Sequence, residues 1–155
     1  MDYSIISYVA LGLIIILGIF ITYGAFKLQE KNFPLEEGEK VLYEEEKVRM
    51  EDVVNGQNTL RNVLVRITDR RMYIFTKRPY LYGIIYFSKP PSDSTKKELK
   101  GMMYILREEF KMDRQDKKTG LPVVTATRKN IIGLDEDYVF KFKEAARAMD
   151  AINKK

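Results

Sequence analysis

Six basic side chains between positions 61 and 78 are the residues best suited to binding chemistry. Arg70 and Arg71 follow Thr68-Asp69 in a predicted turn, and Arg61, Arg66, Lys77 and Arg78 lie near them in the sequence. Guanidinium groups bind phosphate through charge-assisted, often bidentate hydrogen bonds. These six residues are therefore a candidate binding face for phosphate or lipid headgroups. In the competing structural interpretation, Asp69 stabilises the turn by bonding to nearby backbone and the arginines face water.

Other kinds of chemistry have little support in the composition. The 155 residues include no cysteine and no histidine, which removes thiol nucleophiles, zinc–thiolate sites, disulfides and the commonest general base. The acidic run Glu44–Glu46, with the carboxylates at positions 36, 37 and 39, could bind a divalent cation through oxygen, but it lacks EF-hand spacing. The serines have no histidine partner and no G-x-S-x-G turn. We therefore expect no catalysis, no cofactor and no metal site.

The net charge of +5 is unevenly distributed along the chain. Residues 33–60 hold eight acids against three bases, whereas residues 61–100 hold ten bases against three acids. A basic face beside a membrane attracts anionic lipid, at about 1 kcal/mol per Lys or Arg near the surface. The alternative is a solvated surface that the preceding acidic stretch partly neutralises.

One apolar segment near the N-terminus determines where these charges can act. Tyr3 to Phe26 are twenty-four residues without a charge, between Asp2 and Lys27. As a helix this run would reach about 36 Å, enough to span a hydrocarbon core of about 30 Å. It is too long for the apolar core of a cleaved signal peptide and has no basic residue before it. We therefore predict a transmembrane helix over residues 3–27, a charged linker over 28–38 and one domain over 39–155.

The flanking charges predict the orientation of this helix. Lys27 and Lys31 follow it, whereas Asp2 precedes it. The positive-inside rule then places the N-terminus outside and the C-terminal domain in the cytoplasm of a single-pass cell-membrane protein.

After the linker, the sequence predicts seven strands followed by one helix. Alternating apolar residues and turn signals place strands at 40–50, 62–68, 71–77, 80–87, about 103–113, 121–128 and 137–142, with a bulge at Glu44–Glu46 and a tight turn at Asn55-Gly56. Residues 95–112 are ambiguous, because a helix beginning at a capping box also fits them. The helix, 143–153, should pack through Ala145, Ala146, Met149 and Ile152. In the strand 71–77, Arg71 shares a face with Tyr73 and Phe75, so we expect it to be partly covered and paired with a carboxylate.

This order of elements, and two short motifs, carry a resemblance to a known family. VRITDRRMYIF (65–75) resembles the strand–turn–strand signature of GRAM and bacterial pleckstrin-homology (PH)-like domains, in which a hydrophobic-Thr-x-x-Arg-hydrophobic pattern recurs. Gly38-Glu39-Lys40-Val41 resembles the start of their first strand, and DYVFKFKEAARAMDAI (137–152) resembles their last strand and helix. The resemblance implies a mainly β fold: a split seven-stranded barrel capped by a C-terminal α-helix. It also implies binding rather than catalysis.

These observations together predict a membrane-anchored binding module. The first hypothesis is contact between its basic face and anionic lipid headgroups. The second is a protein-interaction subunit of a larger membrane complex, with a partner segment docking on the strand 80–87 or in the groove beside the terminal helix. The partners considered are therefore membrane lipid, another protein, or further copies of the chain in a homo-oligomer. The aromatic residues of the strands are typical of packing rather than of base stacking, so no nucleic acid is expected.

Overall fold

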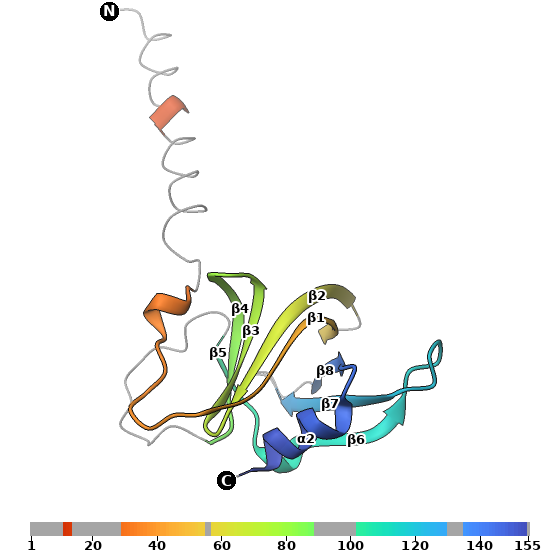
Figure 1. The fold of residues 1–155 in the computed structure, drawn as a ribbon. Helices are drawn as coiled ribbons and strands as arrows, with labels where there is room; N and C mark the ends of the chain where they lie inside the picture. The colour runs from red at the N-terminus through yellow and green to blue at the C-terminus, as the bar shows by residue number, and fades with distance from the viewer. Residues whose placement is uncertain (1–10, 14–28, 55–56, 89–101, 130–134, 155) are drawn as a thin grey trace, which may run out of the picture.

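The computed structural model describes residues 11–13, 29–54, 57–88, 102–129 and 135–154 (Figure 1). Its strands are β1 (Val41–Val54), β2 (Gln57–Thr68), β3 (Arg71–Lys77), β4 (Tyr80–Tyr86), β5 (Met102–Tyr104), β6 (Phe110–Gln115), β7 (Pro122–Lys129) and β8 (Asp135–Lys141). The helices are α2 (Ala145–Asn153) and two 3-10 turns, η1 (Glu30–Asn32) and η2 (Arg107–Glu109). The prediction of a mainly β domain with a C-terminal helix is confirmed.

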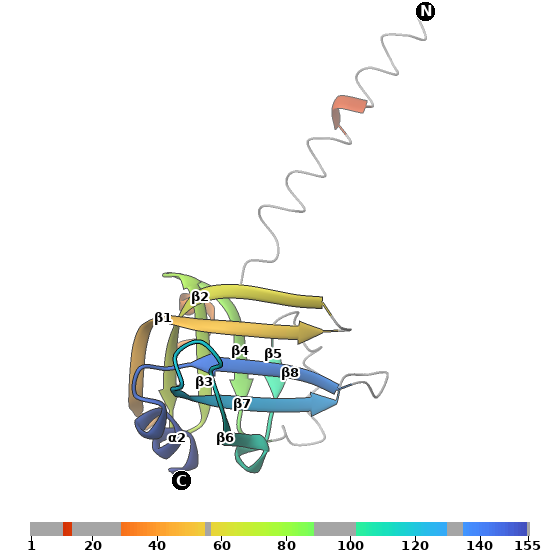
Figure 2. The ribbon, with the colours of Figure 1, turned by 90° about the vertical axis from the view of Figure 1, so that its right-hand side faces the viewer.

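The strands form a single mixed sheet in the order β5-β4-β3-β2-β1-β8-β7-β6. All neighbouring pairs are antiparallel except β4 and β5, which are parallel. β1 joins the two halves of the sheet, since it pairs with β2 along most of its length and with β8 through residues 49–53. Figures 1 and 2 show β3 and β4 running in a different direction from β6, β7 and β8, so the sheet curves around an inner face.

The predicted count of seven strands is wrong, because the stretch 103–113 forms two strands instead of one. Met103 and Ile105 are buried beside β4, and the chain then turns through η2 before Phe110 pairs with Ala126 of β7. The Phe110 ring packs edge-on against Phe87, 5.7 Å between centroids. The residues before η2 thus pair with β4 at one edge of the sheet and those after it pair with β7 at the other edge, so η2 divides the stretch into two strands. The predicted capping box at Thr95–Glu98 lies outside the described residues.

The predicted bulge in β1 is confirmed. The register between β1 and β2 shifts between Glu45 and Val48, and Lys47 has a positive φ of 60°. A bulge of this kind bends a strand and increases its twist. The bend allows one strand to serve both halves of the sheet. The predicted Asn55-Gly56 turn lies outside the described residues, although Val54 and Gln57 pair on either side of it.

The main core lies on the inner face, and α2 packs over one end of it. Alternate residues of each long strand point inward, such as Val48 and Met50 of β1 and Phe140 of β8, all fully buried. The buried residues of α2 are Ala145, Ala148, Ala151 and Ile152. The predicted helix face was therefore partly wrong: Ala146 is exposed, and Ala148 and Ala151 take its place. Small side chains there let the helix approach the sheet closely.

The predicted transmembrane segment, residues 3–27, lies outside the described residues except for one helical turn at 11–13. None of the helices in the described part of the chain has the length and apolar character needed to cross a membrane.

Candidate functional site

Residues 29–40, which we call the strap, lie along the outer face of β3. At one end, Gln29 forms a β-bridge with Tyr80, and Glu30 N–H donates to the carbonyl of Pro79 at 2.9 Å. At the other end, Lys40 N–H donates to the Asp69 carboxylate at 3.0 Å in the β2–β3 turn. The sequence predicted a flexible spacer over residues 28–38, whereas the structure fastens residues 29–40 to the sheet at both ends.

The strap covers a second apolar cluster, on the outer face of the sheet. Tyr73, Phe75, Leu81 and Ile84 are buried there, and Phe33 of the strap packs against them. The Tyr73 hydroxyl donates to the carbonyl of Phe33 at 3.1 Å. Burial raises the pKa of Tyr73 to about 12. β3 is therefore covered on both faces, which explains why it reads as a continuous apolar run rather than an alternating one.

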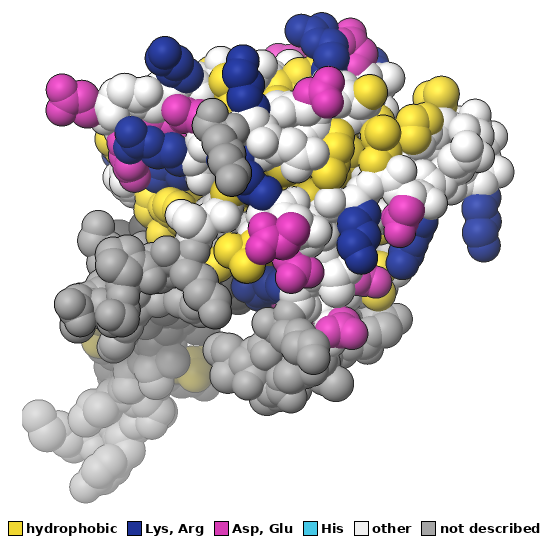
Figure 3. Space-filling view, turned by 90° about the horizontal axis from the view of Figure 1, so that it is seen from below, with side chains coloured by type: hydrophobic (Ala, Val, Ile, Leu, Met, Phe, Trp, Pro, Cys, Tyr) yellow, Lys and Arg dark blue, Asp and Glu magenta, His cyan; other side chains and the backbone are white. Residues whose placement is uncertain are grey.

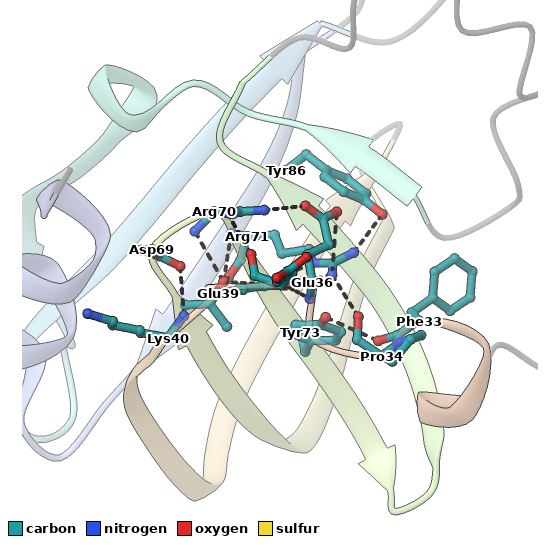
Figure 4. A network of polar contacts seen from close by, with 12 residues as sticks. Phe33, Pro34, Glu36, Glu39, Lys40, Asp69, Arg70, Arg71, Tyr73 and Tyr86 are labelled. Atoms are coloured by element: carbon teal, nitrogen blue, oxygen red, sulfur yellow. Dashed lines mark hydrogen bonds and ion pairs between the residues drawn. The ribbon is translucent and has the colours of Figure 1, made fainter.

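A buried ion pair between Glu39 and Arg71 fixes the strap to the sheet (Figure 4). The Arg71 Nε and Nη2 atoms donate to the two carboxylate oxygens of Glu39 at 3.0 and 2.7 Å. The Glu39 side chain is 0% exposed and that of Arg71 is 4% exposed. Arg71 also donates to the carbonyl of Pro34 and to the Tyr86 hydroxyl. The prediction that Arg71 is covered and paired with a carboxylate is confirmed.

Hydrogen bonding outweighs burial in setting the charge state of this pair. Burial alone would raise the pKa of Glu39, but hydrogen bonds from Arg71, from the Glu36 N–H and from Thr68 together lower it. Burial likewise disfavours the charged form of Arg71, and the hydrogen bond to Glu39 reverses this effect and raises the pKa of Arg71. Both groups therefore remain charged inside the protein.

Two motifs from the sequence meet at this ion pair. Thr68 is fully buried; its hydroxyl lies 2.7 Å from a Glu39 carboxylate oxygen and accepts hydrogen bonds from the N–H groups of Arg70 and Arg71. Thr68 and Arg71 are the two fixed residues of the Thr-x-x-Arg pattern, and Glu39 belongs to the Gly38-Glu39 motif. Gly38 has a φ of +76°, a conformation that favours glycine. The two motifs thus meet in one set of hydrogen bonds among Glu39, Thr68 and Arg71, which we call the lock, although about thirty residues separate them in the sequence.

The other predicted site residues are largely engaged as well. Arg66 pairs with Glu30 and Glu44 at 2.7 and 2.6 Å, and Arg78 pairs with Glu44 at 2.6 Å. Arg70, which is 45% exposed, pairs with Glu36 at 2.6 Å. The Arg61 guanidinium lies over the Tyr82 ring, 4.6 Å from its centroid. Lys77 is exposed and forms no ion pair with a described residue. The structure therefore brings four of the six bases onto carboxylates of the strap and of β1, and leaves Lys77 free to meet a ligand.

Asp69 differs in detail from the prediction. Its carboxylate accepts a hydrogen bond from the N–H of Lys40 rather than from its own turn, and its own N–H donates to the carbonyl of Lys40. Asp69 therefore pairs the β2–β3 turn with the end of the strap.

A second polar cluster lies at one end of the core and was missed in the sequence. We call this set the polar layer: Asp52, Arg61, Tyr82, Arg128, Glu136 and Tyr138. Tyr82 OH donates to Asp52 Oδ2 at 2.5 Å, and Asp52 Oδ1 and Arg61 Nε are buried without a hydrogen-bond partner among the described residues. Burial, reinforced by Asp52, raises the pKa of Tyr82 to about 12. After its bulge, every second residue of β1 faces the core, as Val48 and Met50 do. The same alternation would have placed Asp52 on the inner face.

The acidic groups and a surface hollow of the described residues bear on the question of metal binding and catalysis. No three carboxylates among them gather into a possible metal site. A hollow of about 490 Å³ lies between the starts of β1 and α2, lined by residues 41–46, Lys143, Glu144 and Arg147. Its lining contains neither serine nor threonine. The groups around the hollow form hydrogen bonds and ion pairs, such as the bond from the Tyr43 hydroxyl to the Glu45 carboxylate.

Comparison of the chain with protein-family models, with curated proteins and with solved structures found no match. The resemblance to GRAM and bacterial PH-like domains therefore rests on the residues of this chain, and it stays a prediction.

Proposed function

We propose that this protein is a single-pass membrane protein whose PH-like cytoplasmic domain binds at the membrane surface, with the β3–β4 turn at the level of the anionic headgroups. The supporting observation is the strap. Gln29, two residues after Lys27, is bridged to Tyr80. Two residues span at most about 7 Å. If residues 3–27 cross the bilayer, the turn formed by Lys77, Arg78, Pro79 and Tyr80 lies beside it.

The position of the strap also determines which basic side chains can face the lipid. β3 rises by about 3.3 Å per residue, so Arg71 lies about 20 Å along the strand from Lys77. Arg70 and Arg71 therefore lie at the end of β3 remote from the membrane, and both are paired with carboxylates of the strap. Lys77, with Arg78 beside it and the partly exposed ring of Tyr80, is the group that meets headgroups. The lipid contact is thus a short turn rather than the broad basic face.

The strand order supports the PH-like part of the proposal. Without the short β5, the remaining strands form two antiparallel meanders joined through β1 and β8, and α2 packs over one end of the core. This arrangement agrees with a split seven-stranded barrel carrying a C-terminal helix. The lock at Glu39 also gives one physical role to the two motifs that carry the resemblance, Gly38-Glu39 and Thr-x-x-Arg.

A depth measurement on the full-length protein tests the proposal. The chain has no cysteine, so Thr76→Cys at the end of β3 gives one labelling site, and Thr119→Cys in the β6–β7 turn is the matched control. In liposomes that contain a quencher at the headgroup, we expect a fluorophore at position 76 to be quenched strongly and one at position 119 weakly. Phosphatidylglycerol should increase the quenching at position 76, and Lys77→Glu or added salt should reverse that increase. Equal quenching at the two positions would refute the proposed orientation.

The predicted alternative is a protein-interaction subunit of a membrane complex. This alternative would be favoured if the fluorophore at position 76 is quenched strongly but the quenching does not depend on lipid charge. The outer face of β4 is covered by the strap, so a partner would need another surface.

A further inference from the structure

The β6–β7 hairpin carries an exposed arm, residues 111–121. From Lys111 to Gln115, every residue of β6 is exposed, and the turn after it is exposed except at Asp116. Figure 1 shows this hairpin extending beyond the rest of the sheet, on the side opposite β3 and β4. Figure 3 shows Lys and Arg side chains beside hydrophobic ones on the lower face toward the same side. The arm adds little to the core, so its composition needs another explanation.

The arm carries four bases against two acids. Lys111, Arg114, Lys117 and Lys118 are all exposed, and none forms an ion pair with a described residue. Asp116 pairs with Lys141 of β8 at 3.0 Å and accepts a hydrogen bond from the N–H of Lys118. Asp113 is the one remaining acid of the arm. Arg66, Arg70, Arg71 and Arg78 are bound to carboxylates, whereas the four bases of the arm are not. Among the described residues, the arm is therefore a free basic surface.

The arm also ends the sheet with a free strand edge. β6 pairs with β7 on one side, and no other described strand pairs with it. A free edge presents N–H and C=O groups that a further strand can pair with. Lysines often protect such edges from unwanted pairing. Protection does not explain Met112 and Leu121, which are 40% and 53% exposed on the same arm.

We propose that the free edge of β6 binds an extended acidic segment of a partner protein, which adds to the sheet as a further strand. Carboxylates of the segment would pair with Lys111, Arg114, Lys117 and Lys118, and its apolar residues would cover Met112 and Leu121. Backbone pairing supplies affinity and the side chains supply specificity. A protein segment fits this edge better than the chain's own bilayer does. The proposed function places the membrane at the Lys77 end of β3, and β6 and β7 run across the direction of β3, so the arm does not point toward that membrane.

A peptide-binding experiment on the full-length protein in phosphatidylcholine nanodiscs tests this inference. The probe is a fluorescent twelve-residue peptide of alternating glutamate and valine, followed by anisotropy. We expect saturable binding that weakens at least tenfold in Lys111→Glu/Arg114→Glu, since two attractions become repulsions. The matched control, Lys143→Glu/Lys154→Glu, changes the same charge outside the arm and should bind as the wild type does.

Two further probes decide whether strand pairing is involved. The same peptide with every backbone nitrogen methylated keeps its side-chain charge but has no N–H group to donate along either edge, and it should lose binding. Equal binding of the methylated peptide overturns the inference, because the contact would then be purely electrostatic. Absence of peptide binding, with arm-dependent binding to added phosphatidylglycerol vesicles, overturns it in favour of a membrane surface. Position 76 is not part of this test, so its outcome is separate from that of the depth measurement.

Discussion

The ion pair between Glu39 and Arg71 gives the sharpest test of the strap. In Glu39→Gln the side chain keeps its size, but Arg71, which is 4% exposed, keeps only the more distant and 52% exposed Glu36 carboxylate, 3.6 Å away, as a counter-charge among the described residues. Removing one partner of a buried pair costs about 3–5 kcal/mol. The carbonyl of Pro34 and the hydroxyl of Tyr86 still accept hydrogen bonds from Arg71, so we expect the lower end, about 3 kcal/mol of unfolding free energy.

The matched control is Glu36→Gln. Glu36 pairs with Arg70 at 2.6 Å, but the two side chains are 52% and 45% exposed. Exposed pairs contribute about 0.2–1 kcal/mol. The two substitutions make the same chemical change within one strap. Glu36 also lies 3.6 Å from Arg71, but its side chain is 52% exposed, so the difference between the two variants reports mainly the burial of the Glu39 carboxylate.

Urea unfolding of the full-length protein in detergent, followed by far-ultraviolet circular dichroism, measures both variants. A domain of about 125 residues has a stability of roughly 6–19 kcal/mol, so both variants should remain folded at 25 °C. With a urea dependence of about 1–3 kcal/mol per M, Glu39→Gln should lower the midpoint by about 1–3 M. A midpoint within about 0.3 M of that of Glu36→Gln would refute the reasoning. Glu39→Leu/Arg71→Leu should lose less stability than Glu39→Leu alone, because it leaves no unpaired charge.

Three further outcomes follow from the buried polar groups. Thr68→Val removes a hydroxyl that bonds to Glu39 and two backbone N–H groups, and urea unfolding should show a loss of about 1–3 kcal/mol. Tyr82→Phe leaves Asp52 with neither carboxylate oxygen bonded by a described group, and should cost about 1–3 kcal/mol in the same assay. The lowered pKa of Glu39 adds stability that is present above the unfolded pKa of about 4.3 and is lost as the pH falls through the folded value. Between pH 6 and 3, the wild type should therefore lose more stability than Glu39→Gln; parallel pH profiles would contradict this.

Local patterns in the sequence predicted most of the individual elements. The bounds of β3 were predicted correctly, and β4, β7 and α2 differ by one or two residues, because apolar periodicity and turn residues act over short distances. The bulge in β1 was readable from three consecutive glutamates in an alternating strand. By contrast, β5 has three residues and a parallel neighbour, and nothing in its sequence separates it from the strand that follows.

The pairing of the charged residues could not be predicted, for a different reason. Counting Lys and Arg over residues 61–100 treats every base as free, whereas the pairs that engage them join residues 22 to 36 positions apart. The acids of residues 30–44 and the bases of residues 66–78 were both visible, but only the path of the strap shows that they meet. The free bases of the arm were visible too, in a part of the chain whose overall charge is less extreme.

The position of β1 at the centre of the sheet also affects the synthesis of the chain. The strap and β1 to β4 are consecutive, and Arg71 emerges 32 residues after Glu39, so the outer face can be fastened early. The second neighbour of β1 is β8, which ends 55 residues after β4. At about 5–20 residues per second, this delay lasts about 3–11 s. During those seconds the nascent half-sheet has a closed outer face and an uncovered apolar inner face, and a chain that stops before Asp135 never covers it.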